Sequence, residues 1–309
     1  MTVPDRVTRV HAGGLVVWTW CLTKLVCSQS EEVIVVPTEQ NWVPQSVDVS
    51  VPSAARFYDY LLGGAHNFAV DRQLGDRVEQ VMPHVRSVAR VNRAFLGRAV
   101  RFMVDEGVRQ FLDIGSGIPT VGNVHEVVQE LDPECRVMYV DRDPVAVAHS
   151  ELILAGNDRA GVLQADLRDP DSILNSAEVR RLLDFDQPIG LLMLFMLHWV
   201  PAEAEPWSLS SLLKRYRDAM PSGSYLAITH YADDHGDELI TAAVERVNQQ
   251  GGDQACPRSR DEIAAFFGDF VLVGPGLVRY AEWRTSGPGD ISSDPGVNRL
   301  AYAGVARKP

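Results

Sequence analysis

Hydrophobic residues recur at helical spacing from about residue 52 to residue 106. Ser53 is suited to cap a first helix, which the pair Gly63-Gly64 ends. A second helix is expected from about Asp71, and a third over about residues 87–106. The third helix has one apolar face, and we expect its arginines to lie largely on the other, solvated face (Arg90, Arg93, Arg98 and Arg101).

After Gly107 the pattern changes to short apolar strands that alternate with helical segments. Such alternation predicts a parallel sheet with helices on both faces, because parallel strands need crossover connections. Two late strands without a full crossover between them, at 270–273 and 299–305, predict an antiparallel pair at the sheet edge after a short helix at 261–267. The parallel strands are expected at 110–114, 136–141, 161–165, 189–197 and 224–230, with helices near 119–131, 144–155, 170–183, 206–220 and 236–249.

Residues 1–50 do not share this pattern. The segment 14–27 is apolar, but Lys24 interrupts it and it is too short to span a bilayer. Asp5 precedes it and no small-x-small cleavage site follows, which disfavours a signal peptide. Three alternatives stay open for this segment: a lipoprotein signal ending at Cys27, an amphipathic anchor, and a start codon set too far upstream. We expect a poorly ordered extension over 1–50, a helical cap over 51–106 and a core domain over 107–309.

Composition narrows the possible functions. With 46% hydrophobic and 23% charged residues, the 309-residue chain has ample material for a globular core. Its net charge of −12 disfavours nucleic acid and membrane surfaces as partners and favours a small molecule. Its 4 cysteines form no CxxC pair, so a cytoplasmic location is expected. The sequence also contains no zinc-binding HExxH motif, no GxSxG motif and no phosphate-binding Walker A motif, and we predict no metal. A homo-oligomer is possible, because nothing in the sequence decides the oligomeric state.

A glycine turn follows the first core strand, at residues 113–117. Gly115 and Gly117, with Ser116 between them, let the backbone approach a ligand closely. The third glycine of a dinucleotide-binding fingerprint would fall at Thr120, which disfavours a nicotinamide cofactor. The carboxylate of Asp113 suits a ligand with an ammonium group and no phosphate, namely the methionyl part of S-adenosylmethionine. A purely structural turn is the alternative.

Two further acids follow the next two strands. Asp141, at the end of the second strand, is placed to accept hydrogen bonds from both ribose hydroxyls. Its structural alternative is to cap the following helix, a position that Asp143 fills better. Asp166, after the third strand, is suited to accept from the exocyclic amine of adenine, and Leu167 offers an apolar contact. Three acids at successive strand ends together favour a nucleoside with a sulfonium group.

The fourth and fifth strands also end in residues whose side chains are candidates for a catalytic role. His198 is a candidate general base or a group that orients the substrate, and His230 and Tyr231 end the next strand at the same rim. A structural role is the competing interpretation for all three. Leu197, next to His198, is predicted to contact the cofactor.

These stretches resemble class I S-adenosylmethionine-dependent methyltransferases, and more narrowly an actinobacterial S-adenosyl methyltransferase group long catalogued as a domain of unknown function. The resemblance extends from about residue 52 to the end, and three stretches carry it. They are residues 55–72 (ARFYDYLLGGAHNFAVDR), residues 113–120 (DIGSGIPT) with Asn123 and His125 following, and residues 139–145 (YVDRDPV) followed by 165–168 (ADLR). It implies a Rossmann-like α/β fold with a mostly parallel seven-stranded sheet, an antiparallel last strand and an N-terminal helical cap over the cofactor. It also implies methyl-donor binding by Gly115, Asp141 and Asp166.

The cap suggests further contacts with the cofactor. Tyr58 and Phe68 offer aromatic faces to a sulfonium, with helix packing as the alternative, and Asn67 and Asp71 are within reach of the methionyl end or the acceptor. For Arg56 and Arg72 the expected role is instead structural: they are placed to hold the loop of the 55–72 stretch through nearby carboxylates such as Asp59 and Asp71.

The leading hypothesis is a methyltransferase that uses S-adenosylmethionine and acts on a small-molecule acceptor. A cofactor-binding sensor or interaction protein without catalysis is the alternative. A nicotinamide-dependent oxidoreductase is a third hypothesis that fits the fold but lacks a phosphate cradle.

Overall fold

The computed structural model describes residues 9–12, 15–18, 47–120, 122–204, 206–233, 238–249 and 253–309. Within the first 45 residues, β1 (Arg9–Ala12) and β2 (Leu15–Trp18) form an antiparallel pair. The rest of the segment 14–27, with its possible signal or anchor, lies outside the described residues. Residues 46–309 form a second compact unit.

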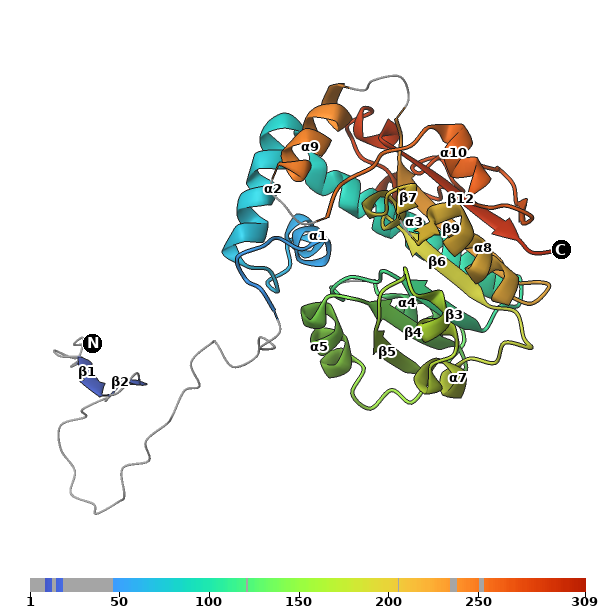
Figure 1. Ribbon diagram of the computed structural model, residues 1–309, viewed down its shortest axis with the longest axis horizontal. Coiled ribbons are helices and arrows are strands. Elements are labelled where there is room, and N and C mark those ends of the chain that lie inside the picture. The colour runs from blue at the N-terminus through green and yellow to red at the C-terminus, as the bar shows by residue number, and fades with distance from the viewer. Residues whose placement is uncertain are drawn as a thin grey trace, which may run out of the picture. The chain divides into compact units, whose positions relative to one another are not determined.

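A central sheet organises this second unit (Figure 1). The strand β3 (Gln110–Ile114) has β4 (Arg136–Asp141) and then β5 (Ala160–Gln164) on one side, and β6 (Gly190–Leu194) and then β9 (Tyr225–Tyr231) on the other, all parallel. Next to β9 lies β12 (Ala301–Arg307), antiparallel to it, followed by β10 (Val271–Leu272). The predicted mostly parallel sheet with an antiparallel last strand is confirmed.

Two short features of the sheet region lie outside the prediction. The strand β11 (Val278–Arg279) also pairs with β12, so the described residues form an eight-stranded sheet rather than seven strands. A separate two-stranded ribbon consists of β7 (Glu203–Ala204) and β8 (Trp207–Ser208). Strands of two residues carry no alternation of hydrophobic and polar positions that a sequence pattern would reveal.

Helices cover both faces of the sheet, as predicted. Because side chains alternate along a strand, Phe111 packs in one core cluster with α3 (Val85–Asp105) and α4 (Val124–Leu131). Its neighbour Leu112 packs in a second cluster on the opposite face. Helices of that face are α6 (Pro170–Leu174), α7 (Ala177–Leu182), α8 (Leu209–Ala219) and α10 (Arg260–Ala265).

Three helices precede the sheet. The first, α1 (Ala54–Leu62), packs against α2 (Ala69–Val81) and α3, and α2 lies beside α9 (Glu238–Asn248) (Figure 1). The predicted end of α1 is confirmed, because Gly63 has a left-handed φ of 83° and its N–H donates to the carbonyl of Tyr60. Ser53 occupies the N-cap position, but its hydroxyl does not cap α1 and instead donates to Asp143 Oδ2.

The expectation of a solvated arginine face on α3 is wrong for Arg98. Its guanidinium is buried, donates to the carbonyls of Trp283 (2.8 Å) and Tyr280 (2.9 Å) and pairs with Asp290 at 3.2 Å. The segment around residues 280–290 covers this part of α3, and Arg98 satisfies its carbonyls. Arg90 and Arg101 are exposed, as expected.

Several predicted elements are shorter than expected, and the helix predicted near 119–131 begins only at Val124, after its N-cap Asn123. The predicted helix at 170–183 is divided, because Ser176 starts α7 by accepting a hydrogen bond from the Val179 N–H. The predicted strand 189–197 ends at Leu194, since Phe195 has a φ of 48° and a short 3-10 helix, η1 (Leu197–Trp199), follows. This early end turns Phe195 and His198 toward the rim of the sheet.

Candidate functional site

A cavity lies where the order of the strands reverses, between β3 and β6. In open α/β sheets the carboxyl ends of the strands on either side of such a point leave room for a ligand. The cavity has an empty volume of about 1210 Å³, part of it open to solvent, and α1 and α3 contribute to its wall. Ten of the predicted site residues line it: Tyr58, Asp113, Gly115, Ser116, Gly117, Asp141, Asp166, Leu167, His198 and Tyr231. An eleventh, His230, precedes Tyr231 in β9 and does not line the cavity.

The glycine turn is held against the sheet by backbone hydrogen bonds. Gly115 has a φ of 71° and donates its N–H to the Val140 carbonyl at 2.8 Å. A Cβ at this position would lie 2.9 Å from the Cβ of Met196, which leaves no room for a side chain. Gly115 is therefore required both by its left-handed backbone and by the close approach of Met196.

Asp113 lies at the floor of the cavity, almost without exposure to solvent. Burial raises the pKa of its carboxyl to about 7, although the nearby positive charge of Arg93 lowers it. Arg93 lines the same cavity, and its buried Nε has no hydrogen-bond partner among the described residues. A carboxyl and a guanidinium together suit a ligand that carries both an ammonium group and a carboxylate.

Asp141 joins the glycine turn to the next loop. Its Oδ2 accepts from the Gly117 N–H at 2.7 Å and its Oδ1 from the Asp143 N–H at 2.9 Å. Burial nevertheless raises the pKa of Asp141 to about 6. Asp143 caps α5 (Pro144–Ile153) by accepting from the Val145 N–H, as predicted. Each oxygen of Asp141 retains a lone pair for a ligand hydroxyl.

Asp166 is engaged by a neighbour. Its carboxylate accepts from the backbone N–H of Arg168 at 2.9 Å and from the Arg168 Nε at 2.8 Å. Burial raises the pKa of Asp166, but these hydrogen bonds outweigh it and hold the pKa below its usual value. Leu167 is kept in place through its carbonyl, which accepts from the Tyr216 hydroxyl at 2.8 Å.

Aromatic rings line the side of the cavity over β6 and β9. Phe195 stacks on Tyr231 with ring centroids 4.6 Å apart and planes at 14°. His198 meets the ring of Tyr231 nearly edge-on at 4.8 Å and lies 4.8 Å from Trp199. These rings, together with Tyr58 of α1, give this side a surface of π-faces and ring edges.

His198 is buried, and its Nδ1 has no hydrogen-bond partner among the described residues. Burial lowers the pKa of His198 well below its usual value, and electrostatic repulsion from a protonated His230 and from Arg258 would lower it further. The imidazole is therefore neutral at physiological pH. A neutral imidazole has one donor and one acceptor nitrogen to offer a ligand.

His230 supports this region without lining the cavity. Its Nδ1 lies 2.8 Å from the Tyr231 carbonyl, and its Nε2 lies 3.0 Å from Arg258 Nη1. The first contact requires a proton on Nδ1, so Nε2 accepts from Arg258. Burial lowers the pKa of His230 to about 3. Arg258 also donates to the carbonyls of Leu197 (3.0 Å) and Val200 (2.6 Å) and so fixes the turn that carries His198.

A chain of hydrogen bonds fixes Tyr58 at the cavity. Its hydroxyl donates to the Ala89 carbonyl at 3.1 Å and accepts from Asn92 Nδ2 at 2.9 Å. Asn92 Oδ1 accepts from the Thr229 hydroxyl at 2.7 Å, and Thr229 Oγ1 accepts from the Phe195 N–H at 2.9 Å. The chain connects α1 and α3 with the ends of β6 and β9.

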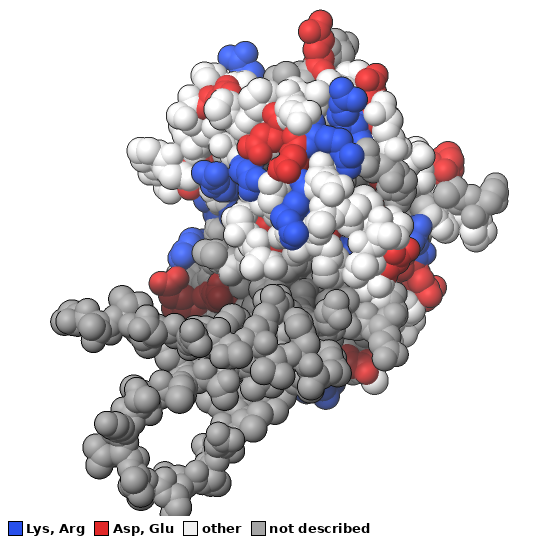
Figure 2. All heavy atoms as spheres, turned by 90° about the vertical axis from the view of Figure 1, so that its left-hand side faces the viewer, with Lys and Arg blue, Asp and Glu red and all other residues white. Residues whose placement is uncertain are grey.

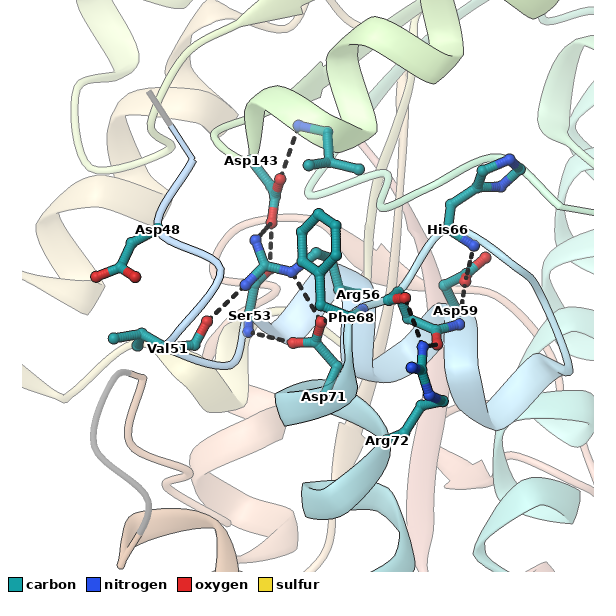
Figure 3. A network of polar contacts seen from close by, with 12 residues as sticks. Asp48, Val51, Ser53, Arg56, Asp59, His66, Phe68, Asp71, Arg72 and Asp143 are labelled. Carbon is teal, nitrogen blue, oxygen red and sulfur yellow. Dashed lines mark hydrogen bonds and ion pairs between the residues drawn. The ribbon is translucent and has the colours of Figure 1, made fainter. Parts of the chain in front are cut away.

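Arg56 links the start of α1 to α2 and α5 (Figure 3). Its Nε donates to Asp71 Oδ2 at 2.9 Å, its Nη1 lies 3.4 Å from Asp143 Oδ2, and its Nη2 donates to the Val51 carbonyl at 2.6 Å. Asp71 also accepts from the backbone N–H groups of Ser53 (3.0 Å) and Phe68 (2.8 Å). The alternative that Arg56 holds the loop through a carboxylate is confirmed, with Asp71 as the partner.

Four of the predicted cofactor-binding residues do not line the cavity: Asn67, Phe68, Asp71 and Leu197. Asn67 donates to Asp59 Oδ2 at 2.8 Å and accepts from Arg72, while Phe68 lies under the Arg56 guanidinium at 4.9 Å. Leu197 is fully buried. Their contacts are with the protein itself, and their role toward a cofactor stays a prediction.

Sequence reasoning missed several residues of the wall, notably Asn92, Arg93, Phe195 and Trp199. Asn92 and Arg93 lie in the middle of an amphipathic helix, where no motif separates them from solvated positions. Phe195 lies inside the strand predicted at 189–197, so its place at the carboxyl edge of the sheet is seen only because β6 ends at Leu194.

Two negative findings apply to the described ranges only. No cluster of three or more histidine, cysteine or acidic side chains there is arranged to bind a metal ion. None of the helices in those ranges combines the length and the apolar character that a membrane span needs.

The sheet order, the glycine turn and the acids at three strand ends define a class I methyltransferase, an enzyme that uses S-adenosylmethionine as methyl donor. The family model described as S-adenosyl methyltransferase matches residues 40–309, and the chain belongs to this family.

Solved structures agree with this assignment. A Thermobifida fusca protein assigned as a methyltransferase is 40% identical, with 87% of this chain and 99% of that chain covered and a TM-score of 0.80. A DUF574 family protein from Streptomyces avermitilis is 33% identical, with 85% and 99% covered and a TM-score of 0.80. A search of curated proteins found no significant match.

Proposed function

We propose that this protein transfers a methyl group from S-adenosylmethionine to a small-molecule acceptor and that the cavity between β3 and β6 is its active site. The observation that carries the proposal is the division of this cavity. Acidic and basic side chains gather over β3, β4 and β5, and aromatic rings gather over β6 and β9. A charged nucleoside and an acceptor therefore have separate walls within one cavity.

The charged side fits the cofactor. The space that a Cβ at Gly115 would fill permits close approach of a ligand, and the buried Ser116 hydroxyl and Arg93 Nε lack protein partners among the described residues. We assign Asp113 to the ammonium group, Arg93 to the carboxylate, and Asp141 to the ribose hydroxyls. Asp166 and Leu167 are assigned to adenine, which requires Asp166 to share its hydrogen bonds with Arg168.

The cofactor supplies an electrophilic methyl group, so the protein mainly has to align the acceptor and exclude water. Tyr58, fixed by Asn92 and Ala89, closes the wall on the α1 side. His198 is the candidate group to bind the acceptor and accept its proton. Its imidazole is uncharged, and its Nδ1 has no hydrogen-bond partner in the described ranges. Tyr231 lines the acceptor side, and His230 acts as support because both of its nitrogens are engaged.

A small acceptor also fits the surface. Acidic and basic side chains are interspersed on the described part of the face in Figure 2, and the net charge of −12 opposes binding to a phosphate backbone. We further propose a cytoplasmic location, which the free thiols of Cys135 and Cys256 support.

Calorimetric titration with S-adenosylmethionine, S-adenosylhomocysteine and NAD tests the proposal. We expect the two sulfur nucleosides to bind and NAD to bind weakly. Asp141→Asn keeps the size of the side chain but removes its charge, and we expect a loss of about 1–3 kcal/mol in binding free energy. The exposed Asp158→Asn is the matched control. Equal affinity of the Asp141 variant, or tight binding of NAD, would overturn the assignment.

A further inference from the structure

The aromatic side of the cavity has a composition that restricts the acceptor. We call this side the aromatic chamber and define it by Tyr58, Leu96, Phe195, His198, Trp199 and Tyr231. These residues belong to α1, α3 and the ends of β6 and β9. They lie across β3 from the strand ends that carry Asp141 and Asp166.

The flat surface of the chamber is fixed in place. Phe195 has a φ of 48°, a conformation that costs free energy for a bulky residue and persists only where the surroundings enforce it. Its N–H donates to both Oγ1 (2.9 Å) and the carbonyl oxygen (3.1 Å) of Thr229, and its ring stacks on Tyr231 at 4.6 Å. A planar ring that enters the chamber therefore meets aromatic side chains already held in position, which lowers the entropic cost of binding.

The protein satisfies the hydroxyl of Tyr58 and leaves other polar groups of the chamber to a ligand. The Tyr58 hydroxyl donates to Ala89 and accepts from Asn92, whose oxygen accepts from Thr229. The buried Nδ1 of His198 has no partner in the described part of the chain, and neither the Tyr231 hydroxyl nor the Trp199 indole N–H has a hydrogen bond there. Of these three groups only the imidazole offers a basic nitrogen to a hydroxyl. Among the chamber residues, none carries a formal charge at neutral pH, and the nearby Arg93, 5.8 Å from the Tyr58 ring, is the group assigned to the carboxylate of the methyl donor. An ionised acceptor would therefore lose its hydration with no charged partner of its own in the chamber.

We propose that the acceptor is a planar, uncharged aromatic compound that presents the group to be methylated, an aromatic hydroxyl, to the imidazole of His198. The inference rests on the proposed function and names its substrate class.

The transfer balances in atoms and charge: a bond forms between the hydroxyl oxygen and the methyl carbon, and the bond between that carbon and the donor's sulfur breaks. The hydroxyl proton passes to His198, so the positive charge of the sulfonium becomes that of an imidazolium. As the new bond forms, the oxygen approaches a protonated ether, which is a far stronger acid than an imidazolium. A buried, weakly basic imidazole can therefore still accept the proton, and then releases it to solvent.

The inference is tested by calorimetry on the full chain saturated with S-adenosylhomocysteine. The probes are a naphthol, its methyl ether, the naphthoate with the same ring position, and the fully saturated decalin alcohol. We expect the naphthol to bind about tenfold more tightly than each of the other three, since it alone combines a stacking face, a donor and no charge. The variant His198→Leu should remove the preference for naphthol over its ether, and Phe195→Leu the preference for naphthol over the saturated alcohol.

The outcomes separate the two proposals. If S-adenosylhomocysteine itself does not bind, the proposed function fails and the inference fails with it. If it binds but the naphthoate or the saturated alcohol binds as tightly as the naphthol, only the inference is overturned. The inference is likewise overturned if His198→Leu keeps the full preference for naphthol over its ether while the affinity for S-adenosylhomocysteine is unchanged.

Discussion

Replacing Arg56 by methionine is a direct test of how the start of α1 is held. Arg56 is only 4% exposed, and Asp71, the nearer of its two acidic partners, is fully buried. Methionine keeps much of the apolar stem and removes the charge and its donors. The variant therefore leaves the carboxylates of Asp71 and Asp143 without their shared cation.

Removing one partner of a buried ion pair costs about 3–5 kcal/mol. Asp71 keeps hydrogen bonds from the N–H groups of Ser53 and Phe68, which partly stabilise its charge. We therefore expect a value near the lower end, about 3 kcal/mol, which is a large share of the roughly 5–15 kcal/mol that separates folded from unfolded domains. Because Ser53, Ala54 and Ala55 line the cavity, affinity for S-adenosylhomocysteine should fall as well.

Urea unfolding of the full chain measures the free energy difference. The control is Arg101→Met, which removes an ion pair with Glu130 at 3.4 Å whose side chains are 48% and 71% exposed. Exposed pairs contribute less than about 1 kcal/mol, so the control should unfold almost like the wild type. If both variants lose the same small amount, Arg56 does not hold α1 and the interpretation of Figure 3 as a stabilising network is refuted.

Three further predictions concern the glycine turn and its acids. Gly115→Ala should weaken S-adenosylhomocysteine binding and cost about 1–3 kcal/mol of stability from strain and the contact with Met196, measured by calorimetry and urea unfolding. The control is Gly156→Ala, which should lose stability from backbone strain alone, because Gly156 has a φ of 85° and no atom lies within 4 Å of the added Cβ. Because the pKa of Asp113 is raised from 3.8 to about 7, the folded state binds more protons than the unfolded state between these values, and stability falls as pH rises through this window. Thermal unfolding should therefore show Asp113→Asn to be more stable than the wild type above about pH 7, with a gain that shrinks toward about pH 4; a gain independent of pH would contradict the raised pKa. Affinity for S-adenosylhomocysteine should decrease as pH falls through about 7 and then about 6, the pKa values of Asp113 and Asp141, because each carboxylate is protonated in turn. Calorimetric titrations of Asp141→Asn across this pH range should lack the step near 6.

Much of the fold follows from local patterns in the sequence. Two strands, which end at Ile114 and Asp141, and one helix, which ends at Leu62, have the predicted boundaries. Each boundary is marked by a local signal, namely an apolar run for the strands and paired glycines for the helix. The positions of Asp113, Asp141 and Asp166 at one rim could also be predicted, since parallel strands bring their carboxyl ends to the same edge.

The contacts that shape the cavity wall are not local. Asn92 meets Thr229 across 137 residues, and Arg56 meets Asp143 across 87. Helical periodicity ranks Arg93 and Arg98 with the exposed arginines of α3, because it records a face of the helix and not what covers that face. Only the packed structure shows that one arginine lines the cavity and the other binds the carbonyls of Tyr280 and Trp283.

The antiparallel strand β12 has a consequence for the order in which the sheet is completed during synthesis. The ribosome makes β9 first, then β10, and β12 only afterwards, yet β12 lies between the other two and pairs with β9 from Ala301 to Arg307. Until β12 has been made, one edge of β9 has no partner and β10 has no strand on which to dock. The nascent chain therefore passes through a stage with an open apolar sheet edge, when chaperones and premature association compete with folding.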